Sequence, residues 1–163
     1  MVLSGILAAS LFLLCGCGLC FGVMNAAGSS TSKKTLTTYY GNSKVIAARY
    51  FQSGGGEEMT SEELPAEKLD KLVETLDSMK LKGHLFHTDY YWGGQFGIEL
   101  DLEDGTYLTY DGTMLEHRST SILTDKGSGK PITSNFLEVT NCEFWEEMKP
   151  FFSTINENMI SSW

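Results

Sequence analysis

The stretch FGIELDLEDGTYLTY, from Phe96 to Tyr110, decides which fold this chain is expected to adopt. Apolar and polar residues alternate in its first half, a pattern typical of a β-strand with one buried face. The dipeptide Asp104-Gly105 then marks a tight turn, after which a second strand-like run begins. The stretch therefore predicts a β-hairpin.

The apolar residues also indicate how the two strands pair. A two-residue loop would set Leu102 opposite Tyr107 and would turn Leu108 toward the charged face of the hairpin. A three-residue loop over 103–105 keeps the apolar residues on one face and places Gly105 at the left-handed position of a bulged turn. We expect this loop, which pairs Leu102 with Thr106, Leu100 with Leu108 and Ile98 with Tyr110.

The opposite face of the hairpin is rich in carboxylates, with Asp101, Glu103 and Asp104 close together and Glu99 before them. A calcium loop needs oxygen ligands at alternate positions before its glycine, and Gly105 stands where the third ligand belongs. We therefore interpret these carboxylates as the solvent-exposed side of the hairpin and its turn.

Further strand-like segments surround the hairpin. The pattern Asp-Gly-Thr returns at 111–113, and two turn signals this close together predict an antiparallel meander. Residues 44–51 and 136–140 have the composition of additional strands, and an acidic loop is expected after the first of them. Glycines and a proline mark 124–134 as a loop.

Two segments have helical periodicity. An apolar stripe over 69–79 follows Pro65, a residue that suits a helix start, and we expect this long helix to end only at Gly83. A second apolar stripe begins at Phe144 and predicts a C-terminal helix, capped by Asn141 and interrupted at Pro150. The expected fold is α+β: an antiparallel sheet of meander hairpins, with one long helix packed on a face and a C-terminal helix.

Charged residues divide the chain into regions. No Asp, Glu, Lys, Arg or His precedes Lys33, and the apolar start is about as long as the roughly 20 residues that cross a bilayer. We expect a signal or lipoprotein leader, or a membrane helix, at 1–27. A polar linker at 28–38 and a single α+β domain at 39–163 follow.

Three of the four cysteines, Cys15, Cys17 and Cys20, lie in this apolar run. Structural zinc sites usually have four ligands, and no histidine or further cysteine is near. The run Leu14-Cys15-Gly16-Cys17 instead resembles the lipobox of bacterial lipoproteins. Together with the linker and the acidic domain, it resembles small uncharacterised lipoproteins of Gram-positive bacteria. The resemblance implies a lipid on Cys17 and a membrane-anchored, extracytoplasmic domain at the cell surface. It implies no activity.

Two other interpretations of the leader remain open. A retained membrane helix would anchor a cytoplasmic interaction domain, and Lys33 and Lys34 after the apolar run favour that orientation. An ordinary signal peptide cleaved near 25–27 would release the domain instead.

Composition and motifs argue against several function classes. The formal net charge of −9 includes no basic cluster, so nucleic acid is not an expected partner. The run 127–130 lacks the first glycine and the hydroxyl residue of a phosphate loop. His84, His87 and Asp89 are interpreted as surface residues, because strand positions three apart point to opposite faces. We expect no metal, no cofactor and no recognisable catalytic residue.

The stretch 89–96 is the most suggestive of binding, because its aromatic residues stand beside glycines. A flat aromatic surface suits a sugar, a peptide or a protein partner. The candidate binding surface consists of Tyr90, Tyr91, Trp92 and Tyr107. The predicted function is a non-enzymatic binding or accessory lipoprotein with a protein or cell-wall ligand. The alternative is a small enzyme whose site the motifs do not reveal.

Overall fold

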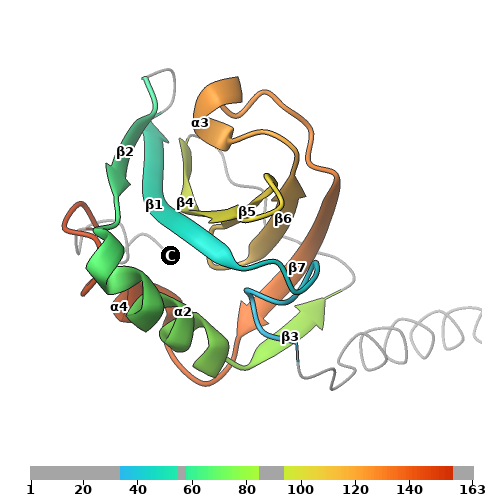
Figure 1. Ribbon diagram of the computed structural model, residues 1–163, viewed down its shortest axis with the longest axis vertical. Coiled ribbons are helices and arrows are strands. Elements are labelled where there is room, and N and C mark those ends of the chain that lie inside the picture. Colours follow the sequence, from blue (N-terminus) through green and yellow to red (C-terminus); the bar gives the residue numbers. More distant parts are fainter. Residues whose placement is uncertain (1–33, 55–57, 85–93, 156–163) are drawn as a thin grey trace, which may run out of the picture.

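The computed structural model describes residues 34–54, 58–84 and 94–155 (Figure 1). They form one antiparallel sheet and a few helices, which confirms the α+β class. The strands are β1 (Val45–Gly54), β2 (Thr60–Glu63), β3 (Leu81–His84), β4 (Gly94–Leu102), β5 (Tyr107–Tyr110), β6 (Met114–Arg118) and β7 (Thr133–Val139). The helices are the 3-10 turn η1 (Ala66–Lys68), α2 (Leu69–Ser78), α3 (Ile122–Asp125) and α4 (Phe144–Met148). Over these ranges, no helix has the length and apolar character needed to cross a membrane.

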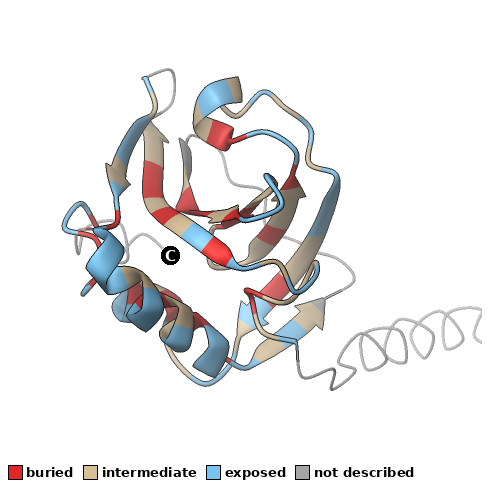
Figure 2. Ribbon diagram, in the orientation of Figure 1, coloured by how far each residue is buried: buried red, intermediate tan, exposed pale blue. Residues whose placement is uncertain are grey.

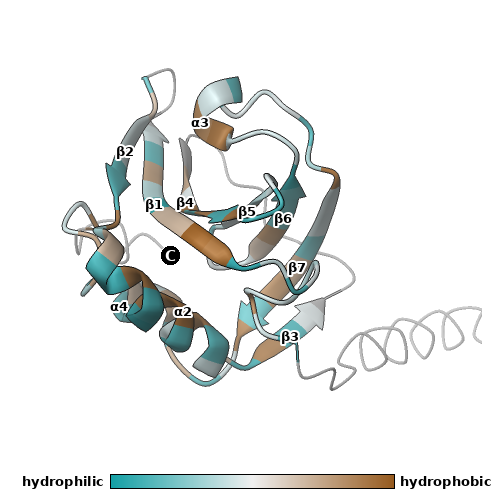
Figure 3. Cartoon of the chain, in the orientation of Figure 1, coloured by the Kyte–Doolittle hydropathy of each residue, from teal (hydrophilic) through white to brown (hydrophobic). Residues whose placement is uncertain are grey.

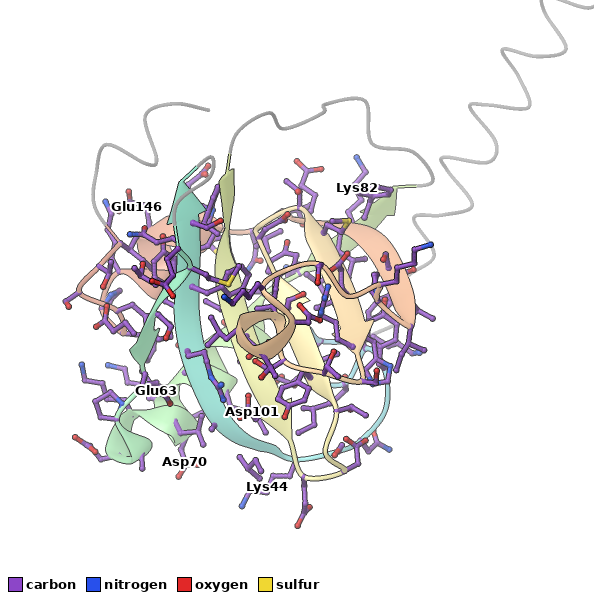
Figure 4. The ribbon with its side chains drawn as sticks, turned by 90° about the horizontal axis from the view of Figure 1, so that it is seen from above. Lys44, Glu63, Asp70, Lys82, Asp101 and Glu146 are labelled. Atoms are coloured by element: carbon purple, nitrogen blue, oxygen red, sulfur yellow. The ribbon has the colours of Figure 1, made fainter. Side chains whose placement is uncertain are left out.

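The seven strands lie in the order β2-β1-β4-β5-β6-β7-β3, and every neighbouring pair is antiparallel. The sheet is strongly curved, with α2 and α4 together on one side (Figure 1). Seen from above, α3 lies in front of the middle of the sheet, on the other side (Figure 4). Both faces of the sheet are therefore covered, each by a different part of the chain.

The central hairpin has the predicted three-residue loop. Gly105 has a φ angle of +82°, a left-handed conformation that glycine adopts without steric cost. The expected register is confirmed: Ile98 lies opposite Tyr110, Leu100 lies opposite Leu108, and the Leu102 N–H donates to the Thr106 carbonyl at 2.9 Å.

The two Asp-Gly-Thr turns are closed by the same hydrogen bonds. Oδ1 of Asp104 accepts from the backbone N–H and the hydroxyl of Thr106, at 2.9 and 2.6 Å. Oδ1 of Asp111 accepts from the same two groups of Thr113, at 2.8 and 2.9 Å. Short polar side chains that bond the backbone two residues on favour tight turns. These turns connect β4, β5 and β6, so the predicted meander is confirmed.

The apolar core lies between the sheet and the helices α2 and α4. Leu72 and Leu76 of α2 are fully buried, and they belong to one cluster with Ile98, Leu100 and Leu108 of the sheet. The inner side of α2 is buried and apolar, whereas its outer side is exposed and hydrophilic (Figures 2 and 3). The predicted packing of this helical stripe on the apolar face of the hairpin is thus present.

The prediction of one long helix ending at Gly83 is wrong. The 10 residues of α2 follow the 3 residues of η1 and end at Ser78, and the chain then enters strand β3. The side chain of Asn141 explains the early end, because it accepts the Lys80 N–H at 2.7 Å and donates to the Ser78 carbonyl at 3.3 Å. Asn141 therefore binds the end of α2 and does not cap the last helix, whose N-cap residue is Glu143.

Several elements have weak local signals and were not expected. The acidic segment after β1 contains the edge strand β2, in which Glu62 lies opposite Tyr50. The segment 119–132 overlaps the expected loop and contains the short helix α3. Strand β3 replaces the expected last turn of the long helix and pairs with β7.

Both ends of the described chain pack into the core. Leu36 is only 1% exposed, so the packed domain overlaps the expected linker at 28–38. At the other end, α4 has 5 residues and ends at Met148, which confirms the break near Pro150. Beyond the break, Phe152 is 1% exposed and continues the core.

Glu62 fixes the segment after α4 to the edge strand. Its two carboxylate oxygens accept the backbone N–H groups of Ser153 and Thr154, at 2.8 and 2.7 Å, and both hydroxyls. Partial burial would raise the pKa of Glu62, but these hydrogen bonds lower it to about 2. The ionised form of Glu62 is therefore the one that holds the C-terminal segment.

We expect Glu62→Gln to lower the free energy of unfolding by about 1–2 kcal/mol near pH 7, because charge-assisted hydrogen bonds are lost. The stabilisation from Glu62 is complete above its ordinary pKa of 4.5 and is lost as the pH falls toward about 2. Urea unfolding at several pH values measures this difference. The exposed neighbour Glu63→Gln is the control, and an equal loss in the two variants would contradict the role given to Glu62.

Candidate functional site

The face of the sheet behind α3 carries a buried charged layer. We use this name for Arg49, Glu99, Asp101, Thr109, Glu116, Arg118, Ser121 and Asp125. Among the described residues, four of the five buried polar side chains belong to it, namely Glu99, Thr109, Arg118 and Ser121, and the fifth is Thr37. The prediction that the carboxylates of this face are solvent-exposed is wrong for Glu99, which is fully buried at 0% exposure, and for Asp101, which is half-buried. It is confirmed for Glu103 and Asp104, which are exposed.

Strand register brings these side chains together. Arg49 of β1 lies opposite Glu99 of β4, Glu99 lies opposite Thr109 of β5, and Thr109 lies opposite Glu116 of β6. Residues opposite one another in a sheet share a face, so the four side chains form a row across four strands. The segment 119–132, which we call the cover, lies over this row.

Both carboxylate oxygens of Glu99 bind the start of α3. The hydroxyl of Ser121 donates to Oε1 at 2.7 Å, and the backbone N–H of Ile122 donates to Oε2 at 2.6 Å. The Ser121 hydroxyl also accepts the Leu123 N–H at 3.2 Å, which caps α3. Burial raises the pKa of Glu99, although these hydrogen bonds and Arg49 act in the opposite direction.

Arg49 is the cation nearest to Glu99 and is shared among three carboxylates. Its Nη1 lies 3.6 Å from Glu99 Oε1, its Nε lies 3.9 Å from Glu63, and its Nη2 donates to Asp101. Burial also raises the pKa of Asp101, against the attraction of Arg49. One guanidinium cannot neutralise three carboxylates, so the two buried carboxyl groups beside Arg49, Glu99 and Asp101, favour the protonated form.

Arg118 is the second buried cation of the layer, with a side chain that is 4% exposed. Nη1 donates to Glu116 at 2.9 Å, and Nη2 donates to Asp125 at 2.9 Å and to the Gly129 carbonyl at 2.7 Å. Burial lowers the pKa of Arg118, but its hydrogen bonds with Asp125 and Glu116 outweigh that effect and raise it. Arg118 thus joins β6 to the end of α3 and to the middle of the loop that follows it.

The run 127–130, which partly resembles a phosphate loop, encloses a carboxylate of this chain. Oδ1 of Asp125 accepts the Gly127 N–H at 2.9 Å, and Oδ2 accepts the Thr120 hydroxyl at 3.0 Å. A Cβ atom on Gly129 would come within 2.1 Å of Asp125 Oδ2, so a side chain at this position would displace the Asp125 carboxylate. The anion in the loop is therefore Asp125 itself.

Three buried atoms of the charged layer make no hydrogen bond within the described residues, namely Arg49 Nε, Asp101 Oδ1 and Arg118 Nε. Within the same ranges, no three His, Cys, Asp or Glu side chains are grouped to hold a metal ion. The chemistry that the arrangement supports is the uptake and release of protons by crowded carboxyl groups.

A separate aromatic surface lies at the other end of β4. Phe96 and Trp145 are half-buried, with ring centroids 5.2 Å apart. Trp145 also contacts Tyr50 and Phe144 of the core edge-to-face, at 6.2 and 4.9 Å. Edge-to-face aromatic contacts are favourable, so the core holds both rings in place while part of each reaches the surface.

The structure describes one of the four residues that the sequence grouped as a binding surface, Tyr107. Tyr90, Tyr91 and Trp92 lie outside the described residues, as do His87 and Asp89. Tyr107 lies opposite Asp101 and is half-buried on the face of the charged layer, whereas Phe96 lies on the face of the apolar core.

Two other side chains with chemically reactive groups, the imidazole of His117 and the thiol of Cys142, lie within the described residues. The ring of His117 stacks on Tyr40 with centroids 5.2 Å apart. Cys142 is half-buried, and burial, together with Glu147 and Glu143, raises the pKa of its thiol. A raised pKa reduces the thiolate population, so this thiol is poorly nucleophilic. His84 belongs to β3 by its backbone, and its side chain is not described.

Comparisons with protein-family models, with curated proteins and with solved structures found no match. The charged layer and the aromatic surface are the two candidate sites within the described residues. Sequence reasoning missed the charged layer because alternation identifies the residues that share a face but not what covers that face. The available signal was Arg49 and Arg118, the two arginines of the chain, each of which stands on a strand-like segment.

Proposed function

We propose that this chain is a membrane-tethered extracytoplasmic domain that acts as a binding or accessory protein, anchored through a lipid on Cys17. The apolar leader and the run Leu14–Cys17 support the anchor. The packed domain begins soon after the apolar leader in the sequence, since Leu36 is already part of its core. A short connection of this kind would hold the domain near the membrane surface.

The observation that carries the binding role is the half-buried pair Phe96 and Trp145. Rigid aromatic side chains give large contact areas at a low cost in conformational entropy, and they are frequent at binding hot spots. Phe96 comes four residues after Trp92 in the sequence, in the same stretch as Tyr90 and Tyr91. We propose that the partner, a protein or a cell-wall polymer, is bound by these residues together.

Mass spectrometry of the N-terminus of the full chain, purified from membranes, tests the anchor. The expected product begins at Cys17 and carries a diacylglycerol group on its thiol. An intact Met1 without lipid would contradict this proposal and would favour a retained membrane helix.

Co-sedimentation with purified insoluble peptidoglycan tests the binding role for the cell-wall ligand. Trp92→Ala is expected to weaken binding by tenfold or more, as loss of an aromatic hot spot does. Ile132→Ala is the control, because Ile132 is 55% exposed and precedes β7, outside the aromatic surface. Unchanged binding by the Trp92 variant, or equal weakening by both variants, would refute the aromatic surface as the binding site.

A further inference from the structure

The cover, residues 119–132, is attached to the sheet at a small number of points. At its start, Glu99 binds Ser121 and Ile122, and these are its only buried residues. At its middle, Arg118 binds Asp125 and Gly129. Segments with few buried apolar contacts open at a lower free-energy cost than the core does.

The attachment at Glu99 is the one that reaches the middle of the sheet. Glu99 is fully buried, and both of its oxygens are bonded to the first residues of α3. If the cover moved away, Ser121 and Ile122 would leave the carboxyl group, and water would reach it. The closed position therefore keeps a carboxyl group dehydrated, and the open position would hydrate it.

The groups that face Glu99 come from every neighbouring element. Arg49 of β1 approaches at 3.6 Å and is shared with Asp101 of β4 and Glu63 of β2. On the other side lie Thr109 of β5 and then Glu116 of β6, whose carboxylate pairs with Arg118. Arg118 is also paired with Asp125 of the cover. Carboxylates outnumber guanidinium groups here, so an ionised Glu99 is incompletely neutralised.

A protonated Glu99 fits the closed position with the same neighbouring groups, but one hydrogen bond reverses its direction. Its O–H can donate to the Ser121 oxygen, which also accepts the Leu123 N–H, and the Ser121 O–H then no longer donates to Glu99. Its other oxygen continues to accept the Ile122 N–H. The closed position is therefore compatible with the neutral acid, whereas the ionised acid carries the cost of dehydration.

We propose that residues 119–132 form a hinged cover over the charged layer and that the protonation of Glu99 controls how tightly this cover is closed. Below the ordinary pKa of the carboxyl group, Glu99 is protonated in both positions and closure is tightest. As the pH rises, the open position, in which Glu99 is hydrated, gains population. Opening uncovers a polar surface that includes Arg49, Thr109 and Arg118.

Hydrogen exchange of the full chain at several pH values tests this proposal. The protection factor of the Ile122 amide, after division by the intrinsic exchange rate, reports opening of the cover, and the Leu108 amide in the core reports global unfolding. We expect opening to increase about tenfold for each pH unit over the range in which closed Glu99 remains protonated and open Glu99 is ionised. Leu108 protection should exceed that of Ile122 throughout.

Two variants identify the group responsible. In Glu99→Gln, which resembles the neutral acid, Ile122 protection should no longer depend on pH, whereas Glu116→Gln should retain the dependence. The proposal is wrong if Ile122 protection in the native chain is independent of pH. It is also wrong if the dependence survives in Glu99→Gln, or if Ile122 and Leu108 are equally protected.

Discussion

Replacing Glu99 with alanine is expected to lower the free energy of unfolding by about 3 kcal/mol below pH 4.5, and by less as the pH rises. The substitution leaves the Ser121 hydroxyl and the Ile122 N–H, which bind Glu99 at 2.7 and 2.6 Å, without an acceptor. Equilibrium unfolding in urea, with the midpoint and slope compared with those of the native chain, measures the loss.

Glu99→Gln is the matched control for this prediction. Its amide group can donate to Ser121 and accept from Ile122, so we expect stability within about 1 kcal/mol of the native chain. Because burial raises the pKa of Glu99 above 4.5, the stabilisation from Glu99 is complete below that pH and is lost as the pH rises. The stability of the glutamine variant relative to the native chain should therefore increase as the pH rises. Equal losses in the alanine and glutamine variants would contradict this account of the site.

Replacing Arg118 with methionine is expected to cost about 3 kcal/mol as well, because removal of one partner of a buried ion pair leaves the other uncompensated. The variant leaves Glu116 and Asp125 without their cation and the Gly129 carbonyl without its donor. Thermal unfolding of the variant and the native chain in parallel measures the change.

The control is Lys130→Met, which removes a positive charge from an exposed position of the cover. Its effect should stay within about 0.5 kcal/mol, as is usual for surface substitutions. Burial alone would raise the pKa of Asp125, but Arg118 and other hydrogen bonds hold it below 3.8. The interaction of ionised Asp125 with Arg118 therefore stabilises the fold above pH 3.8 and is lost as the pH falls. Acid should thus narrow the difference in free energy of unfolding between Arg118→Met and the native chain. A loss no larger than that of Lys130→Met would contradict a structural role for the pair.

The hairpin from Phe96 to Tyr110 was predictable because its signals are local. A period-two pattern and an Asp-Gly turn define strand, register and loop within fifteen residues, and no distant contact opposes them. The apolar stripe over 69–79 was predictable for the same reason, since its spacing alone determines which side of the helix is buried.

The end of α2 was not predictable from its own sequence. Lys80, Lys82 and Gly83 are suitable residues for a helix end, and the local signals favour a longer helix. Asn141, 61 residues away from Lys80, binds the backbone there and directs the chain into β3. Tertiary hydrogen bonds thus override the weak preference of a few residues for helix.

The burial of the charged layer was likewise not predictable from local sequence, because a tertiary contact decides it. Glu99 lies on the polar side of an alternating strand, and such a side faces water in many antiparallel sheets. It is buried here because a segment that begins twenty residues later, with little apolar content, folds back over it. The candidate surface around Trp92 is an inference from composition, and the structure independently shows the aromatic pair Phe96 and Trp145.

The sheet has a second buried layer on the side opposite the apolar core, in which Glu99 is dehydrated and carboxylates outnumber guanidinium groups. A carbon-13 NMR titration of the side-chain carboxyl groups of the full chain tests this claim most directly. We predict that the Glu99 resonance titrates with a midpoint above 4.5, while Glu62, which accepts four hydrogen bonds from Ser153 and Thr154, titrates at about 2. A Glu99 midpoint at or below 4.5 would contradict the claim.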